Sequence, residues 1–241
     1  LGSLLCGSLF LLASLLPFNP SSKQCWFRQL MSKGCKAYLN MLNKLGVLTY
    51  SMTPESTITD SGRIVVANHP TLLDAVFIVS MVPNLCCITK SALWTNPLTA
   101  SVVRMAGYIR NDAVDFTELA TSKLNNQENL LIFPEGTRNS RDDQLDFKRG
   151  AANLAILSCA DIIPIIIHCH PRTLQKNEKW YQIPPQRPHF TITKLPVLRT
   201  KNYALSPQNP RTIQYRKLTQ ALRYIYVDWL AQNKPQLKDR S

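Results

Sequence analysis

The stretch RIVVANHPTLLDAVFIVSMV, residues 63–82, decides the fold of this 241-residue chain. Its first five residues form a short β-branched run, which is typical of a buried strand. Residues 70–82 then show helical periodicity and begin with a proline, which suits the first turn of a helix. The sequence therefore predicts a strand, a polar junction at Asn68 and His69, and a helix.

Strands and helices continue to alternate on the C-terminal side of this stretch. Further strands are expected at residues 85–89, 108–110, 130–133, 162–169 and 189–195. Further helices are expected at residues 96–105 with Asn96 as the N-cap, and at 115–125, 149–159 and 211–232. Such alternation favours a layered α/β fold. We expect a mainly parallel sheet flanked by helices, in one α/β domain over residues 51–241.

His69 and Asp74 lie five positions apart, just beyond the first predicted strand. In α/β folds, functional groups gather at the carboxyl ends of strands. A histidine oriented by a carboxylate is a general base for a hydroxyl group, because the carboxylate fixes the tautomer and stabilises the imidazolium. The chain has no G-x-S-x-G motif, so the pair predicts activation of an external hydroxyl. A strand-end histidine capped by the next helix is an equally good interpretation of this motif alone.

A second polar motif, Phe133-Pro134-Glu135-Gly136-Thr137-Arg138, also follows a predicted strand. Gly136 permits a tight turn, and an arginine binds a phosphate through two parallel hydrogen bonds. The carboxylate is a candidate partner for that arginine or for a substrate hydroxyl. An ordinary loop ion pair explains the motif as well. If the strands are parallel, both motifs lie at the same edge of the sheet.

Four blocks in order, NHPTLLD, GYIRND, FPEGTR and IIPIII, span about residues 60–170 and resemble the lysophospholipid acyltransferase family. The resemblance implies a glycerolipid acyltransferase-like fold, with His69 as the base and Asp74 as its partner. It implies substrate binding by Asn68, Lys90, Arg110, Phe133, Glu135, Gly136, Thr137, Arg138 and Pro164. Arg110 and the third block would bind the acceptor's phosphate, and Pro164 would line the side of the acyl donor.

The activity that the resemblance implies is transfer of a fatty acyl group to a lysophospholipid hydroxyl. The donor would be an acyl thioester of coenzyme A or of acyl carrier protein, and the acceptor 1-acylglycerol-3-phosphate, giving phosphatidic acid. Pro70-Thr71 departs from the Gln-Ser that many such members have after the histidine. Another acceptor, of the ornithine-lipid or polyene-lipid type, therefore stays open, as does a thioester hydrolase. We expect no further cofactor and no metal ion.

Charge and hydropathy patterning indicate a membrane surface as the partner. Residues 1–54 hold five basic residues and no acidic one, and the formal net charge of the chain is +13. Residues 4–18 form an apolar run, and residues 24–45 read as an amphipathic helix with a cationic polar face, typical of an interfacial helix. We expect residues 1–50 to be membrane-associating helices, with the catalytic domain at the cytoplasmic face of the inner membrane.

The remaining composition narrows the class of protein. Seven cysteines without C-x-x-C spacing do not form a disulfide framework and fit a reducing compartment. An excess of lysine places a membrane surface on the cytoplasmic side. Aromatic and basic residues do not interleave as they do in RNA-binding modules, so we do not expect nucleic acid as a partner.

Overall fold

The computed structural model describes residues 19–53, 58–138, 145–179, 181–182, 184–204 and 210–238. The predicted apolar run at residues 4–18 lies outside them. In chain order the elements are α2 (Pro20–Lys44), β1 (Thr49–Met52), β2 (Ile64–Ala67), α3 (Asp74–Met81), β3 (Leu85–Thr89), α4 (Ala92–Thr95), α5 (Ala100–Met105), β4 (Ile109–Arg110), α6 (Phe116–Asn125), β5 (Asn129–Ile132), α7 (Gly150–Ser158), β6 (Ile162–His170), β7 (His189–Lys194), a 3₁₀ turn η2 (Thr200–Asn202) and α8 (Arg211–Lys238).

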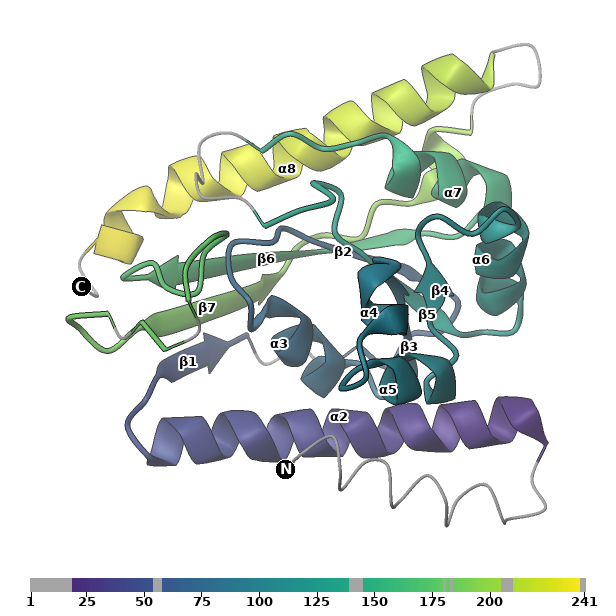
Figure 1. Cartoon of the computed structure of the whole chain (residues 1–241). Coiled ribbons are helices and arrows are strands. Elements are labelled where there is room, and N and C mark those ends of the chain that lie inside the picture. The colour runs from purple at the N-terminus through teal and green to yellow at the C-terminus, as the bar shows by residue number, and fades with distance from the viewer. Residues whose placement is uncertain are drawn as a thin grey trace.

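The strands form one sheet in the order β1-β7-β6-β2-β5-β3-β4 (Figure 1). All neighbours pair in parallel except β6 and β7, which are antiparallel. The prediction of a mainly parallel sheet flanked by helices is therefore confirmed. β2 lies between β6 and β5, and all four of its residues are buried. A strand covered on both faces reads as a continuous apolar run, which is why the sequence signalled it clearly.

Helices cover both faces of the sheet, and each face has its own hydrophobic cluster (Figure 1). On one face, side chains of α6, α7 and α8 pack on alternate residues of β2 and β6, including Ile64 and Ile166. On the other face, α2 and α3 pack on the residues between them, such as Val65 and Ile165. This alternation follows from the two-residue period of a strand.

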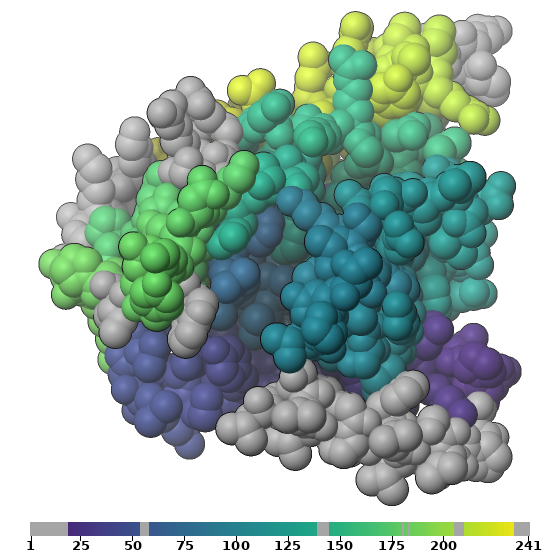
Figure 2. Space-filling model, viewed as in Figure 1, coloured from purple at the N-terminus to yellow at the C-terminus, as the bar shows by residue number. Residues whose placement is uncertain are grey.

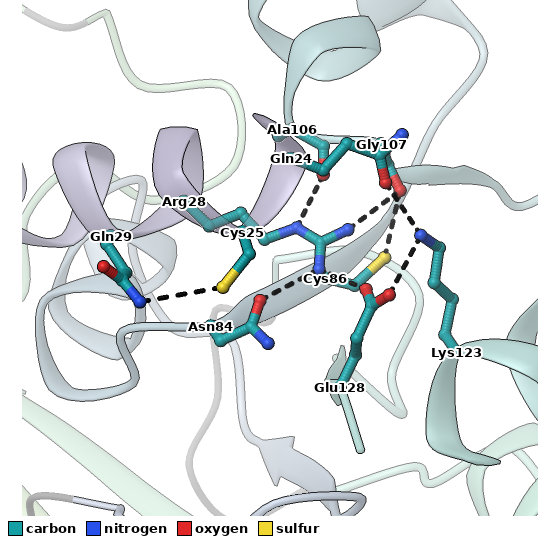
Figure 3. Close-up of polar contacts among 10 residues, drawn as sticks. All are labelled: Gln24, Cys25, Arg28, Gln29, Asn84, Cys86, Ala106, Gly107, Lys123 and Glu128. Atoms are coloured by element: carbon teal, nitrogen blue, oxygen red, sulfur yellow. Dashed lines mark hydrogen bonds and ion pairs between the residues drawn. The ribbon is translucent and has the colours of Figure 1, made fainter. Parts of the chain in front are cut away.

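The predicted amphipathic helix is present as α2, and a buried cation fixes it to the domain (Figure 3). Arg28 is 2% exposed and forms an ion pair with Glu128 at the start of β5. Its Nε also donates to the carbonyl of Ala106 at 2.6 Å, and its Nη1 to Asn84 at 3.1 Å. A charge this deeply buried is tolerated because its donors meet several acceptors.

α2 also leaves apolar side chains uncovered by the described part of the protein. Phe27 and Leu39 are buried, but Trp26, Tyr38, Met41 and Leu45 are 43–68% exposed. Lysines, among them Lys33, share the exposed surface. Within the described residues, no helix combines the length and the hydropathy that crossing a membrane requires.

Two local predictions were wrong, and one strand was not predicted. The helix expected from Pro70 begins only at Asp74, because residues 70–73 form a turn that bonds to that aspartate. Asn96 does not cap a helix N-terminus but ends the unexpected α4, and Thr99 precedes α5. The edge strand β1 was not expected either. β1 spans residue 50, which is the predicted boundary between the membrane-associating helices and the α/β domain. That boundary stays a prediction.

Candidate active site

The site is built at the carboxyl ends of β2 and β5, two adjacent parallel strands. From β2 the chain passes through α3 to β3, which lies on the same side of β2 as β5. It later returns through α7 to β6, which pairs with the opposite side of β2. A reversal of this kind opens a crevice beyond the strand ends. Figure 2 shows the surface hollowed between the green segment that follows β6 and the teal α4 and α5.

The predicted histidine–aspartate pair forms. His69 Nδ1 lies 2.8 Å from Asp74 Oδ2. The Asp74 side chain is fully buried, whereas the His69 side chain is 20% exposed. Because the carboxylate accepts the Nδ1 proton, Nε2 is left as the basic nitrogen that faces away from Asp74. The pair therefore has the geometry of a general base with one solvent-accessible nitrogen.

Thr71 donates two further hydrogen bonds to the Asp74 carboxylate. Its backbone N–H donates to Asp74 Oδ2 at 2.7 Å and its hydroxyl donates to Oδ1 at 2.6 Å. Burial raises the pKa of Asp74, while the bonds from His69 and Thr71 oppose that rise. In the sequence, Thr71 stands out only as a departure from the family pattern. The T-x-x-D spacing, which resembles a capping box before an apolar run, is the signal that identifies it.

The second motif packs directly against the first. The Phe133 ring stacks on the His69 imidazole, with centroids 4.1 Å apart and an interplanar angle of 20°. The buried carboxylate of Glu135 accepts the backbone N–H of His69 at 2.9 Å. Glu135 therefore fixes the loop that carries His69, a contact that the sequence motif did not indicate.

Gly136 turns the chain with a φ of +70°, in the left-handed region that favours glycine. The ammonium of Lys148 lies 3.1 Å from the position that a Cβ at Gly136 would occupy. Lys148 also ties its own backbone to the motif, since its N–H donates to the carbonyl of Pro134 at 2.9 Å. The place of Lys148 beside Gly136 is set by the fold, and the sequence motif does not include this lysine.

The predicted cations lie along the same edge of the sheet but are held differently. Arg138 Nη1 donates to the carbonyls of Leu174 and Gln175, both at 3.0 Å. Arg110 is 47% exposed and bonds through Nε and Nη2 to Asp112, which lowers the pKa of Asp112. Lys90 directly follows β3 and is exposed. Exposed ion pairs are weak, so the guanidinium of Arg110 is easily recruited by an anion.

The other predicted residues have different surroundings. The Asn68 side chain is buried and exchanges two hydrogen bonds with the backbone of Ile167, at 2.7 and 2.8 Å, which extends the pairing of β2 with β6. Pro164 is buried near the start of β6, opposite Val66. Thr137 is half-buried within the second motif. Substrate contacts by these three residues stay predictions, as do those of the other predicted site residues.

Comparisons with known proteins give one consistent family. The family model described as "Acyltransferase" matches residues 50–168. The 1-acyl-sn-glycerol-3-phosphate acyltransferase alpha of Mus musculus is 32% identical over 129 residues, which are 50% of this chain and 45% of that protein. The 1-acyl-sn-glycerol-3-phosphate acyltransferase of Helicobacter pylori is 32% identical over 117 residues, 45% of this chain and 49% of that protein. The chain thus spans about half the length of the curated relatives it matches.

A solved structure shares the fold. The crystal structure of the 1-acyl-sn-glycerophosphate acyltransferase from Thermotoga maritima superimposes with a TM-score of 0.64. The alignment covers 91% of this chain and 88% of that one at 20% sequence identity.

Proposed function

We propose, from the premise that this chain belongs to the acyltransferase family over residues 50–168, that it transfers a fatty acyl group from an acyl thioester to the hydroxyl of a lysophospholipid. The acceptor that we favour is 1-acylglycerol-3-phosphate, which gives phosphatidic acid, because relatives on both sides of the bacterial–animal divide carry that substrate in their names. The observation that carries the proposal is the buried Asp74 bonded to Nδ1 of a partly exposed His69.

In the proposed reaction, His69 Nε2 removes the proton from the acceptor hydroxyl. The acceptor oxygen attacks the thioester carbonyl, an ester C–O bond forms, and the C–S bond breaks. The departing thiolate takes the proton from the imidazolium. Asp74 holds the ring and stabilises its positive charge between these two proton transfers, and general base catalysis of this kind contributes about 10²- to 10⁴-fold to a rate.

The acceptor's phosphate fits the cationic end of the site. Arg138 and Lys148 flank the turn at Gly136, whose neighbour Glu135 bonds to the backbone of His69. Holding a phosphate there orients the adjacent hydroxyl toward the base, so that binding energy is used for alignment. Arg110 and Lys90, at the ends of β4 and β3, extend the positive edge. The donor is an acyl thioester of coenzyme A or of acyl carrier protein, with no further cofactor.

The outward face of α2 suits a membrane surface. Trp26, Met41 and Leu45 are 47–68% exposed and lie among lysines, the composition of an interfacial helix. We propose that this face rests on the cytoplasmic leaflet. Changing these three residues to Ser should lower flotation with anionic phospholipid vesicles, whereas changing the exposed Tyr224 and Val227 of α8 to Ser should not. An equal loss from both variants would contradict the assignment.

The test of the function uses the full chain with labelled acyl-CoA or acyl carrier protein thioester and a panel of acceptors. The panel contains 1-acylglycerol-3-phosphate, other lysophospholipids and lyso-ornithine lipid, and products are identified by mass. His69→Ala should lower kcat about 10³-fold, and Arg138→Ala should raise the KM for the acceptor far more than that for the donor. Near wild-type turnover in His69→Ala would sink the mechanism.

Two outcomes separate the alternatives. Free fatty acid released at the same rate with and without acceptor would identify a thioester hydrolase, in which His69 activates water. If product forms only with an acceptor that lacks a phosphate monoester, the protein is an acyltransferase that acts on an acceptor other than 1-acylglycerol-3-phosphate.

A further inference from the structure

We propose that Leu174 is a positioning residue, whose backbone carbonyl aligns Arg138 with the loop that carries the base. This inference rests on the proposed function, since it takes Arg138 to bind the acceptor's phosphate. Leu174 follows β6 and lies beyond the family match, which ends at residue 168. The sequence motifs contain no indication of this role.

Arg138 is held by one corner of its guanidinium. Nη1 donates to the carbonyls of Leu174 and Gln175, each at 3.0 Å. Among the described residues, no acceptor bonds to its Nε or Nη2. A guanidinium is planar and rigid, so fixing one nitrogen sets the direction of the others. Within the part of the chain that the structure describes, Nε and Nη2 are then left for two parallel hydrogen bonds to a phosphate.

The same carbonyl also reaches the first motif. The backbone N–H of Leu72 donates to the oxygen of Leu174 at 3.1 Å. Leu72 lies between His69 and Asp74, whose side chains are hydrogen-bonded. One carbonyl oxygen therefore joins the loop of the general base to the arginine of the anion end. A fixed separation between these two ends is what alignment of an acceptor hydroxyl requires.

The backbone at Leu174 has the left-handed conformation that aims this carbonyl. Its φ is +55°, which a leucine adopts at a cost of about 1–2 kcal/mol. Two neighbouring contacts hold the turn in place: Thr173 is 6% exposed, and the N–H of Gln175 donates to the carboxylate of Glu178 at 2.8 Å. Strain that the surroundings maintain in this way is characteristic of functional sites.

Cys159 offers a matched control for a backbone test. Cys159 also has a φ of +55° and is exposed. Cys159 precedes β6, whereas Leu174 follows that strand. A β-branched residue resists this conformation, so Leu174→Val and Cys159→Val should lower the melting temperature similarly. Leu174→Val alone should raise the KM for 1-acylglycerol-3-phosphate about tenfold, with the KM for the acyl donor within about twofold. Leu174→Gly, which adopts a positive φ freely, should keep the acceptor KM of the wild type.

The outcomes are distinguishable. If the wild-type protein transfers no acyl group, or if Arg138→Ala leaves the acceptor KM unchanged, the proposed function fails. If Arg138→Ala raises that KM but Leu174→Val changes it no more than Cys159→Val does, the positioning role is overturned. Hydrogen exchange gives a second measurement should Leu174→Val misfold. Arg138→Gln, which leaves Leu174 in place, should speed exchange of the Leu72 amide, and an unchanged rate would also overturn the role.

Discussion

Replacing Thr71 by Val tests how the buried carboxylate of Asp74 is kept in the site. Valine has nearly the shape of threonine, so the change removes little packing. It removes two bonds of the hydroxyl: the 2.6 Å bond donated to Asp74 Oδ1 and the 3.2 Å bond accepted from the backbone N–H of Leu73. Asp74 is fully buried, so water cannot replace the lost donor. A hydrogen bond to a charged group contributes about 1.5–3 kcal/mol. For a chain of this size, a loss of about 2 kcal/mol corresponds to a fall in Tm of about 4–8 °C.

The stability loss should depend on pH. Burial raises the pKa of Asp74 above its ordinary value of 3.8. A carboxyl group with a raised folded-state pKa reduces stability as pH rises from the unfolded-state pKa through the folded-state pKa, because the folded protein must then hold an ionised group in a buried site. Without the threonine hydroxyl the pKa of Asp74 rises further. The Tm deficit of Thr71→Val should therefore be larger at pH 8 than at pH 4, which is close to the ordinary pKa of an aspartate.

Thermal unfolding at both pH values and initial rates of acyl transfer measure the effect. Thr219→Val is the matched control. It removes a hydroxyl in the same way, but the lost 2.7 Å bond goes to the neutral carbonyl of Tyr215 in α8 and not to a carboxylate. Thr71→Ser should restore most of the Tm, and Thr71→Val should lower kcat about tenfold as Asp74 orients His69 less well. A pH-independent deficit no larger than that of Thr219→Val would refute the reasoning.

Three further predictions follow from the same structure. Gly136→Ala and Gly46→Ala both place a side chain at positive φ, and each variant should lose about 1 kcal/mol of stability. Only Gly136→Ala should raise the KM for the acceptor. Its Cβ would meet Lys148, whereas nothing lies within 4 Å of the corresponding position at Gly46. Arg28→Met should cost about 3 kcal/mol, since the carboxylate of Glu128 loses its buried partner and keeps Lys123. Adding Glu128→Gln should recover part of the lost Tm, and strictly additive losses would contradict the buried pair. Phe133→Leu removes the ring stacked on His69 and should lower kcat with little change in the donor KM, which steady-state rates will report.

The sequence predicted the sheet well where strands are buried on both faces. β2 and the first part of β6 are runs of aliphatic residues. A strand that is buried on both faces needs apolar side chains on both, so such a run indicates a buried strand even when its neighbours in the sheet are unknown. β1 lacks that signal. Its residues TYSM are all half-buried, and the strand forms only by pairing with β7 from the far end of the chain. Its existence depends on a partner, so local periodicity could not indicate it.

The candidate site divides in the same way. The sequence predicted a pair of His69 and Asp74 beside an equally good capping interpretation, and the structure contains the pair, because five residues and one short turn are enough to bring the two together. It also indicated that both motifs lie at one sheet edge, since each follows a strand. The contacts of Glu135 with the His69 backbone and of Lys148 with the Gly136 turn join residues far apart along the chain, and no local pattern encodes them.

The sequence by itself therefore predicted the mainly parallel sheet, the histidine–aspartate pair and a group of cations at one edge of the sheet. These properties reside in residue type, period and short spacing. Only the tertiary structure decided what each polar group bonds to: Asn68 extends a strand pair, Arg28 fixes a helix, and the Leu174 carbonyl holds Arg138. The physical reason is that a hydrogen bond needs a distance and a direction, and the packing of distant segments sets both.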